Sequence, residues 1–325
     1  MNLHRNLAGF VAVLATSAAM AQAPRAQGPA IGFVIDARTN RIHPVIGVPG
    51  AAVVGAAVDT PSEATARAVS PTGAYVLAWS DTDRLPALWL PSSGAHPLEG
   101  LMPGADRVAL SPEGTAAAFY YATENRMVVV SGLPDHPSSP AEINQVPLAV
   151  APGTWAVSDD GELLMCASSA GQTGAVVVLG TTGERNRLTL SGPVTALAFA
   201  PRTHDALAAS GTDVVLIRDA GRPTGWIPLP ATGVGPVSAI AGSVEAGKVM
   251  LASAESGKVA VLSLDWSQPP ALLDCHCKPE GFFQMNEGAV YRLSGYAGGT
   301  VHILDITAAP RILALPPAVE PDKEP

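Results

Sequence analysis

Charged and aromatic side chains are scarce in this sequence of 325 residues. Only 14% of the residues are Asp, Glu, Lys or Arg and 5% are aromatic, whereas 47% are hydrophobic. Disordered chains combine low hydrophobicity with high charge, so disorder of the whole chain is excluded. Long helices are excluded as well, because 32 glycines and 30 prolines interrupt the chain and both residues weaken helix interiors. We expect an all-β, turn-rich protein with a large apolar interior.

Clusters of basic residues are also missing. The chain has 19 Lys and Arg residues against 28 Asp and Glu residues, which gives a formal net charge of −9. Proteins that bind nucleic acid neutralise phosphates with clustered lysines and arginines. The sequence therefore predicts no nucleic-acid partner and no attraction to an anionic membrane surface.

Long hydrophobic runs are absent beyond the N-terminus, where Gly, Pro or a charge interrupts each run within about a dozen residues, short of the roughly 20 that span a bilayer. The N-terminus has a short positive start at His4 and Arg5, an apolar stretch over residues 7–20, and small residues at Ala19 and Ala21. This pattern is typical of a signal peptide, and a buried N-terminal helix is the weaker alternative. We predict a signal peptide over residues 1–21, cleavage after Ala21, and a secreted or periplasmic protein without membrane insertion.

A turn sequence recurs between short apolar runs. Its clearest copies read Ser-Pro-Thr-Gly from Ser70, Ser-Pro-Glu-Gly from Ser111 and Ser-Asp-Asp-Gly from Ser158. Proline presets φ and glycine accepts positive φ, so each copy predicts a tight turn between two strands. Six anchor residues follow one another at steps of about 41 to 47 residues, which indicates a repeat architecture. They are Ser70, Ser111, Ser158, Ala200, Ser243 and Met285.

Each repeat holds four apolar runs of strand length. The third run ends in Asp in residues 214–219, 259–265 and 301–305, and residues 311–315 are an example of the fourth. Four strands in roughly 43 residues is the size of one β-propeller blade. The turns quoted above resemble those of WD40-like and related bacterial β-propellers. That resemblance covers most of the chain after the leader, implies the fold and points to no particular function. No repeat has the Gly-His start or the Trp-Asp end of WD40 repeats, so their hydrogen-bond network is not expected.

The number of blades follows from the repeats. Six anchors predict six blades, and apolar runs in residues 31–36, 43–47 and 51–55 predict an incomplete seventh. We predict a single β-propeller domain over residues 22–316, most simply with seven four-stranded blades, with six or eight as alternatives. Ring closure would remove exposed strand edges. Residues 317–325 are rich in proline and charge and predict a disordered tail.

Cysteine is rare, with three in the chain. Cys275 and Cys277 flank His276, and in an extended segment their Cα atoms would lie near the ~6.8 Å limit for bridging, so a bond needs a bend. We predict a structural disulfide between Cys275 and Cys277, which an exported protein allows. Free thiols, pairing with Cys166, or a redox or metal-binding pair with His276 are the alternatives. Cys166 lies in an apolar run and is expected to be a buried apolar residue.

Signatures of catalysis are absent from the sequence. The seven histidines are scattered without metal-protease spacing, and no Gly-x-Ser-x-Gly element marks a serine hydrolase. The glycine-rich runs at residues 171–174 and 295–299 fall between predicted strands, so we expect turns there and no phosphate-binding loop. We predict no catalytic residue, no metal and no cofactor.

Two further sets of residues have a structural and a functional interpretation. Four aspartates end predicted strands, and we expect each to cap its turn through backbone hydrogen bonds, with a calcium site at the ring as the alternative. These are Asp36, Asp219, Asp265 and Asp305. Most tryptophans are expected between blades, with stacking on sugars as the alternative. They are Trp79, Trp89, Trp155, Trp226 and Trp266.

Three functions fit these observations. The first is a non-catalytic exported propeller that binds a protein or peptide on one face, and we favour it because no catalytic constellation is found. The second is a structural subunit of a cell-envelope assembly. The third is a propeller enzyme of the lactonase or quinoprotein-dehydrogenase type with its site in the central channel, which fold analogy alone permits.

Overall fold

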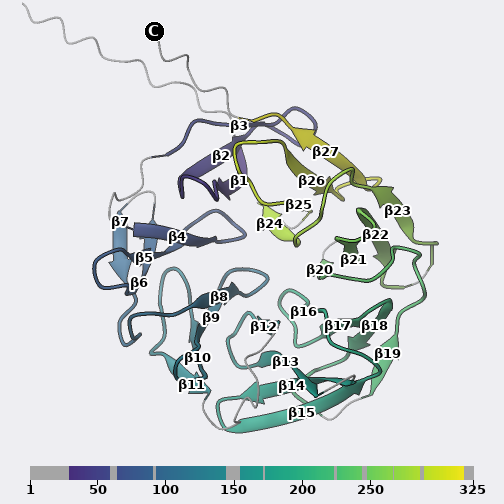
Figure 1. Ribbon diagram of the computed structural model, residues 1–325, viewed down its shortest axis with the longest axis horizontal. Coiled ribbons are helices and arrows are strands. Elements are labelled where there is room, and N and C mark those ends of the chain that lie inside the picture. The colour runs from purple at the N-terminus through teal and green to yellow at the C-terminus, as the bar shows by residue number, and fades with distance from the viewer. Residues whose placement is uncertain are drawn as a thin grey trace, which may run out of the picture.

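Seven antiparallel sheets stand around a central axis and form a ring (Figure 1). The computed structural model describes residues 29–58, 64–90, 93–143, 154–170, 173–222, 225–243, 247–265, 267–285 and 289–317. The predicted signal peptide lies outside these residues, as does the predicted tail except for Pro317. We number the sheets as blades 1 to 7 in chain order.

The first four blades lie between the N-terminus and the middle of the chain. Blade 1 contains β1 (Ala30–Ile35), β2 (Ile42–Ile46) and β3 (Val53–Val54). Blade 2 contains β4 (Ala64–Val69), β5 (Val76–Ser80), β6 (Pro86–Leu90) and β7 (Gly94–Pro97). Blade 3 contains β8 (Arg107–Leu110), β9 (Ala116–Tyr121), β10 (Arg126–Ser131) and β11 (Ala141–Ile143). Blade 4 contains β12 (Trp155–Val157), β13 (Leu164–Ala170), β14 (Thr173–Gly180) and β15 (Gly183–Leu190).

The remaining three blades complete the ring. Blade 5 contains β16 (Ala196–Phe199), β17 (Ala206–Ser210), β18 (Asp213–Ile217) and β19 (Trp226–Pro228). Blade 6 contains β20 (Ala239–Ser243), β21 (Lys248–Ser253), β22 (Lys258–Ser263) and β23 (Ala271–Asp274). Blade 7 contains β24 (Phe283–Met285), β25 (Val290–Arg292), β26 (Val301–Asp305) and β27 (Arg311–Leu315).

The prediction of an all-β propeller with seven blades is confirmed. Strands follow one another across each sheet in chain order, with the first strand innermost. Blade 1 differs from the four-stranded prediction, because β3 is its last strand in the described part of the chain. Within the described ranges, no helix is long and apolar enough to cross a membrane.

The repeated serine turn joins the first and second strands of a blade. In blade 3, the Ser111 N–H donates to the Ala116 carbonyl at 2.9 Å, and the Ala116 N–H donates to Ser111 Oγ at 3.0 Å. The Gly114 N–H donates to the Ser111 carbonyl at 3.0 Å, and Gly114 has a φ of +74°. Ser70 and Ser158 make the same side-chain bond to the fifth residue along. The hydroxyl therefore closes the turn, and glycine supplies its left-handed residue.

Strand β9 shows why the blades are so apolar. Its six residues, all buried, send alternate side chains to opposite faces of the sheet. Phe119 packs toward blade 2, with its ring centroid 5.9 Å from that of Trp79. Tyr120 packs toward blade 4, with its ring centroid 5.7 Å from that of Trp155. Both faces of this sheet are covered by neighbouring blades, so its strand is apolar throughout.

The ring closes where blade 1 meets blade 7, and no strand of the described residues is exchanged between the two sheets. The Ala37 N–H donates to the Tyr296 carbonyl at 2.8 Å. The His43 ring meets the Tyr296 ring edge-on, with centroids 5.3 Å apart. Val34 and Ile303 share one hydrophobic cluster across this junction. Side-chain packing and a backbone contact between Ala37 and Tyr296 therefore close the ring.

Candidate functional site in the central channel

The centre of the ring holds a channel of about 490 Å³, a volume typical of ligand-binding pockets. All seven blades contribute to its wall through β1, β4, β8, β12, β16, β20 and β24 or the residues next to them. Each of these strands is the inner edge strand of its sheet and pairs with a neighbouring strand on one side only. Their inner edges therefore turn backbone N–H and C=O groups toward the channel.

Small side chains form the middle of the wall. In blades 2 to 6, the residue two positions before the turn anchor is alanine, and each of these alanines is partly exposed. They are Ala68, Ala109, Ala156, Ala198 and Ala241. A methyl group occupies little space, so this repetition keeps the channel open. The sequence analysis missed these residues, although their constant offset from the anchors was a readable signal.

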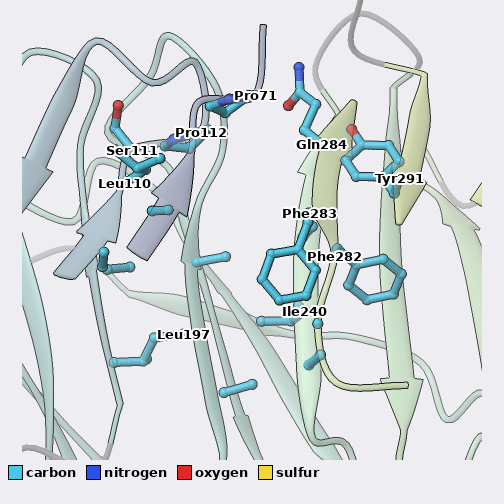
Figure 2. Close-up of a pocket in the computed structure, with 18 of the residues that line it drawn as sticks. Pro71, Leu110, Ser111, Pro112, Leu197, Ile240, Phe282, Phe283, Gln284 and Tyr291 are labelled. Atoms are coloured by element: carbon cyan, nitrogen blue, oxygen red, sulfur yellow. The ribbon is translucent and has the colours of Figure 1, made fainter. Parts of the chain in front are cut away.

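Blade 7 has Phe283 at the position where blades 2 to 6 have alanine. Its ring points into the channel, whereas Phe282 turns to the other side of the strand (Figure 2). Phe283 is 43% exposed, while Phe282 packs edge-on against Tyr291 with centroids 6.2 Å apart. Leu197 of blade 5 and Ile240 of blade 6 also line the channel, and Leu197 lies across from Phe283 in this view. We call these three residues the apolar platform, in which Phe283 supplies an exposed aromatic ring.

Arg292 covers the ring of Phe283. Its guanidinium carbon lies 4.0 Å from the ring centroid, which is cation–π distance. Its Nη1 also donates to the Ser294 carbonyl at 2.8 Å. Burial lowers the pKa of Arg292 to about 10, although the nearby Glu280 carboxylate acts in the opposite direction. Arg292 is therefore a largely desolvated cation that still carries its charge at neutral pH.

Charge on the described channel wall is sparse and leans positive. Arg67, Arg292 and Glu280 are its only charged side chains. Glu280 accepts a hydrogen bond from the Gly295 N–H at 3.0 Å and lies close enough to Arg292 to raise its pKa. Arg67 is exposed, sits 5.9 Å from the centroid of the Trp79 ring, and forms no ion pair with any described carboxylate. Among the described residues, Arg67 is thus a wall cation without a carboxylate partner, in a chain whose net charge is −9.

The serine turns border one mouth of the channel, which we call the turn mouth. Pro71, Ser111, Pro112 and Gln284 lie together at this end (Figure 2). Nearby, Asp159 accepts the Glu113 N–H from blade 3 and the Arg202 N–H from blade 5, each at 2.7 Å. One carboxylate therefore ties the turns of three consecutive blades together.

A set of residues that can hold a metal ion lies on these turns. Ligand atoms of Asp160, Glu162 and His204 all fall within 4.8 Å of one another. His204 Nε2 is 2.7 Å from Asp160 Oδ2, and Ser158 Oγ donates to Asp160 Oδ1 at 2.6 Å. Burial opposes ionisation of Asp160, but these bonds and one from the Glu162 N–H lower its pKa. The observed hydrogen bonds already satisfy this carboxylate. The sequence analysis missed the set because His204 belongs to the next blade.

The four strand-end aspartates behave largely as predicted. Asp36, Asp265 and Asp305 each accept a backbone hydrogen bond from the second residue along, at 2.9 to 3.0 Å. Asp219 differs, because its carboxylate pairs with Arg222 at 3.0 Å. The calcium interpretation is not supported, since these aspartates form no metal-binding group in the described part of the chain.

The tryptophans split between the interior and the surface. Trp79 and Trp89 are buried, and Trp155 packs between Tyr120 and the guanidinium of Arg107, which lies 4.4 Å from its ring centroid. Trp226 departs from the expectation, because β19 is the outermost strand of blade 5 and leaves it 47% exposed. Trp266 lies outside the described residues.

The cysteines occupy two separate places. Cys275 and Cys277 are in contact, with Cα atoms 4.9 Å apart, and His276 between them has a φ of +50°. The bend that a bond between them requires is therefore present, and the disulfide itself stays a prediction. Cys166 is fully buried 3.5 Å from Met127 Sδ, as expected for an apolar residue.

The glycine-rich run at residues 295–299 lies between two antiparallel strands, β25 and β26, as predicted. Of the run at residues 171–174, Thr173 and Gly174 begin β14, which pairs antiparallel with β13. Residues 171–172 themselves lie outside the described chain. A phosphate-binding loop would instead lead from a strand into a helix N-terminus.

Solved structures share this fold at low sequence identity. The β-propeller domain of Cps50 (Swd1) from Myceliophteria thermophila has a TM-score of 0.55 and 13% identity, covering 86% of this chain and 98% of that one. KlHsv2 with a replaced loop 6CD has a TM-score of 0.56 and 11% identity, covering 88% and 97%. Hydrazine synthase from Kuenenia stuttgartiensis has a TM-score of 0.53 and 10% identity, covering 96% and 100%.

These likenesses define the class of protein as a β-propeller and do not define its activity. No protein-family model and no curated protein matches the sequence. The WD40-like expectation is therefore met at the level of the fold, without a specific repeat family.

Proposed function

We propose that this protein is an exported, non-catalytic binding scaffold whose central channel takes up a peptide segment of a partner protein. The observation that carries the proposal is the channel itself, a cavity of about 490 Å³ with an apolar wall. Five alanines keep it open, and Phe283 presents an exposed aromatic ring inside it. Exposed aromatic groups in a concave apolar site are typical anchors for a ligand.

The chemistry of the wall favours binding over catalysis. General acid–base catalysis needs titratable groups placed against each other. The described lining contains a single carboxylate, that of Glu280, and no histidine. Backbone groups on the inner strand edges instead suit an extended peptide, which forms main-chain hydrogen bonds with an exposed strand edge.

Blocking the channel tests this proposal. Ala198→Phe adds a bulky aromatic ring to the channel, and Ala156→Leu provides a milder block at the equivalent position of blade 4. Ala95→Phe on the exposed outer strand β7 is the matched control. Peptides selected from a random heptapeptide pool should bind the wild type and Ala95→Phe and lose binding to folded Ala198→Phe and Ala156→Leu. Equal binding by all four proteins places the site elsewhere and overturns the proposal.

Export is the second part of the proposal and rests on the N-terminal leader pattern alone. Expression of the full chain in a bacterium, followed by cell fractionation and N-terminal sequencing, tests it. We expect mature protein that begins at Gln22 outside the cytoplasm. Unprocessed protein in the cytoplasm contradicts the proposal.

A further inference from the structure

We infer that the channel recognises the C-terminal end of its partner, an apolar terminal residue with its free α-carboxylate, which Arg67 meets. This inference rests on the proposed function and specifies its ligand. Four features of the channel carry it: the charge of its wall, the place of Arg67, the apolar platform around Phe283 and the free strand edges.

The charge of the wall limits the number of negative groups that a ligand can carry. Arg292 is accompanied by Glu280 and covers Phe283, so its charge is partly compensated. Arg67 forms no ion pair with a described carboxylate and has no such compensation. A segment with many acidic side chains would face Glu280 and a chain of net charge −9. A single carboxylate matches the Arg67 guanidinium, which no carboxylate of the described residues pairs with.

Arg67 lies where its guanidinium is accessible to the carboxylate of a ligand. It lies in β4, at a point where the strand bulges between Ala66 and Ala68, so the regular pairing with β5 skips it. The bulge leaves Arg67 outside the regular pairing, and its guanidinium carbon lies 5.9 Å from the centroid of the Trp79 ring on β5. Its guanidinium is exposed yet lies near the Trp79 ring, so an anion can reach it without breaking an existing ion pair. A planar guanidinium binds a carboxylate through two parallel hydrogen bonds.

The rest of the wall suits an apolar residue. Phe283, Leu197 and Ile240 present apolar surface to the same cavity that Arg67 lines. An apolar side chain buried there is removed from water, which favours binding in proportion to the apolar area covered. An apolar residue carries a carboxylate of its own only at the end of a chain. The combination of one cation with an apolar wall therefore fits a C-terminus better than an internal segment.

The inner strand edges distinguish a peptide from a small carboxylate. The innermost strands leave their inner backbone groups without strand partners. An extended chain end supplies matching N–H and C=O groups at regular spacing, and a small carboxylate does not. We therefore assign the site to a polypeptide end.

Two peptide pools test the inference. Heptapeptides with six random positions and a C-terminal Leu, Phe or Val are prepared with a free carboxylate and, separately, with a terminal amide. Each pool is passed over the immobilised wild-type protein, and retained peptides are identified by mass spectrometry. The best sequences are then synthesised in both forms, and their dissociation constants are measured by fluorescence anisotropy. N-acetyl-phenylalanine serves as the small carboxylate probe.

We expect the free-acid pool to yield binders and amidation to weaken each of them about tenfold or more, as loss of a charged hydrogen bond implies. Arg67→Gln should weaken the free acids by a similar factor and leave the amides unchanged, while Arg67→Lys retains part of the affinity. Arg185→Gln, on the exposed face of β15, is the matched control and should change nothing. N-acetyl-phenylalanine should bind far more weakly than the heptapeptides.

Equal affinity for acids and amides, an unchanged affinity in Arg67→Gln, or tight binding of N-acetyl-phenylalanine overturns the inference. If peptides still bind and Ala198→Phe abolishes that binding, the proposed function stands and only the carboxylate assignment fails. If neither pool yields a binder, the proposed function fails together with the inference.

Discussion

The guanidinium carbon of Arg292 lies 4.0 Å from the centroid of the Phe283 ring. The pair therefore combines a desolvated cation with the one aromatic side chain that takes the place of an alanine in the channel. The ring compensates part of the lost hydration of the guanidinium, since aromatic faces attract cations. The contact also holds Phe283 in place while leaving its outer part exposed.

A double-mutant cycle on this pair provides the first prediction. Phe283→Leu keeps an apolar side chain but removes the π face, and we expect a loss of about 1 kcal/mol in the free energy of unfolding. Arg292→Met removes the cation. If the contact stabilises the fold, the double variant should lose less than the sum of the two single losses when measured by urea denaturation. Additive losses contradict a direct interaction.

The second prediction concerns Asp159, which joins the turns of blades 3, 4 and 5. Asp159→Asn retains one acceptor but turns an amide N–H₂ toward a backbone N–H, so one bond is lost. We expect a loss of about 1 kcal/mol in the free energy of unfolding, the typical net value of one hydrogen bond, because both donors are partly or fully exposed. Asp135→Asn, at an exposed position, is the control and should stay within about 0.5 kcal/mol of the wild type. An equal effect of both changes excludes the bridging role.

The third prediction separates backbone strain from crowding at the serine turn. A Cβ on Gly114 would lie 2.7 Å from Pro71 Cδ in blade 2, at a φ of +74°. Gly104 has a φ of +84° but no atom near its would-be Cβ. Gly104→Ala should cost about 1 kcal/mol through strain alone. Gly114→Ala should cost clearly more, because it also pushes two blades apart. Thermal denaturation of both variants measures the difference in melting temperature. Equal decreases in melting temperature contradict a steric clash between residue 114 and Pro71.

Thiol titration tests the cysteine assignments. Burial raises the pKa of Cys166 to about 12, so this thiol should not react with Ellman's reagent in the native protein. If Cys275 and Cys277 are bonded, the unreduced native protein shows no reactive thiol, and unfolding without reductant releases only that of Cys166. Reduction then exposes all three. Three thiols on unfolding alone contradict the disulfide.

The last prediction follows from Asp305, the buried partner of Arg311 at 2.8 Å. Burial of the Asp305 carboxyl opposes its ionisation, but hydrogen bonds from Thr307 and the pair with Arg311 lower its pKa overall. Because the folded-state pKa lies below the unfolded value of about 4, this group stabilises the fold above that pH. The stabilisation is lost as the pH falls through the folded-state pKa.

Urea denaturation between about pH 6 and about pH 2 measures this dependence. Asp305→Asn should be less stable near neutral pH and should lose less stability on acidification than the wild type. Glu99→Gln, at an exposed position, should keep the wild-type slope. If the free energy of unfolding of Asp305→Asn falls with pH as steeply as that of the wild type, the Asp305 carboxylate is not the source of the pH dependence.

Local features of the fold were predictable because short segments encode them. The Ser111 turn needs only a hydroxyl at its first position and a glycine that tolerates positive φ, and both are visible in the sequence. The six anchors predicted six blades, and three apolar runs near the N-terminus predicted an incomplete seventh. Blade 1 has these three strands in the described part of the chain.

The composition of the channel was not predictable in the same way. Phe283 and Arg67 lie in different blades and are more than two hundred residues apart in the chain. The sequence shows Ala198 and Ala241 as ordinary strand residues, and only ring closure turns them toward a common space. Likewise, Asp160 and His204 meet because adjacent blades bring their turns together.

The amino-acid sequence by itself determined the strands, the serine turns and the number of blades, because hydrogen bonding within a few residues and a regular apolar period specify them. The tertiary structure alone decided how the ring closes, which side chains face the axis and which charged groups of the described residues pair with one another. Those properties arise from packing between residues that are distant along the chain, where neither turn chemistry nor periodicity carries information.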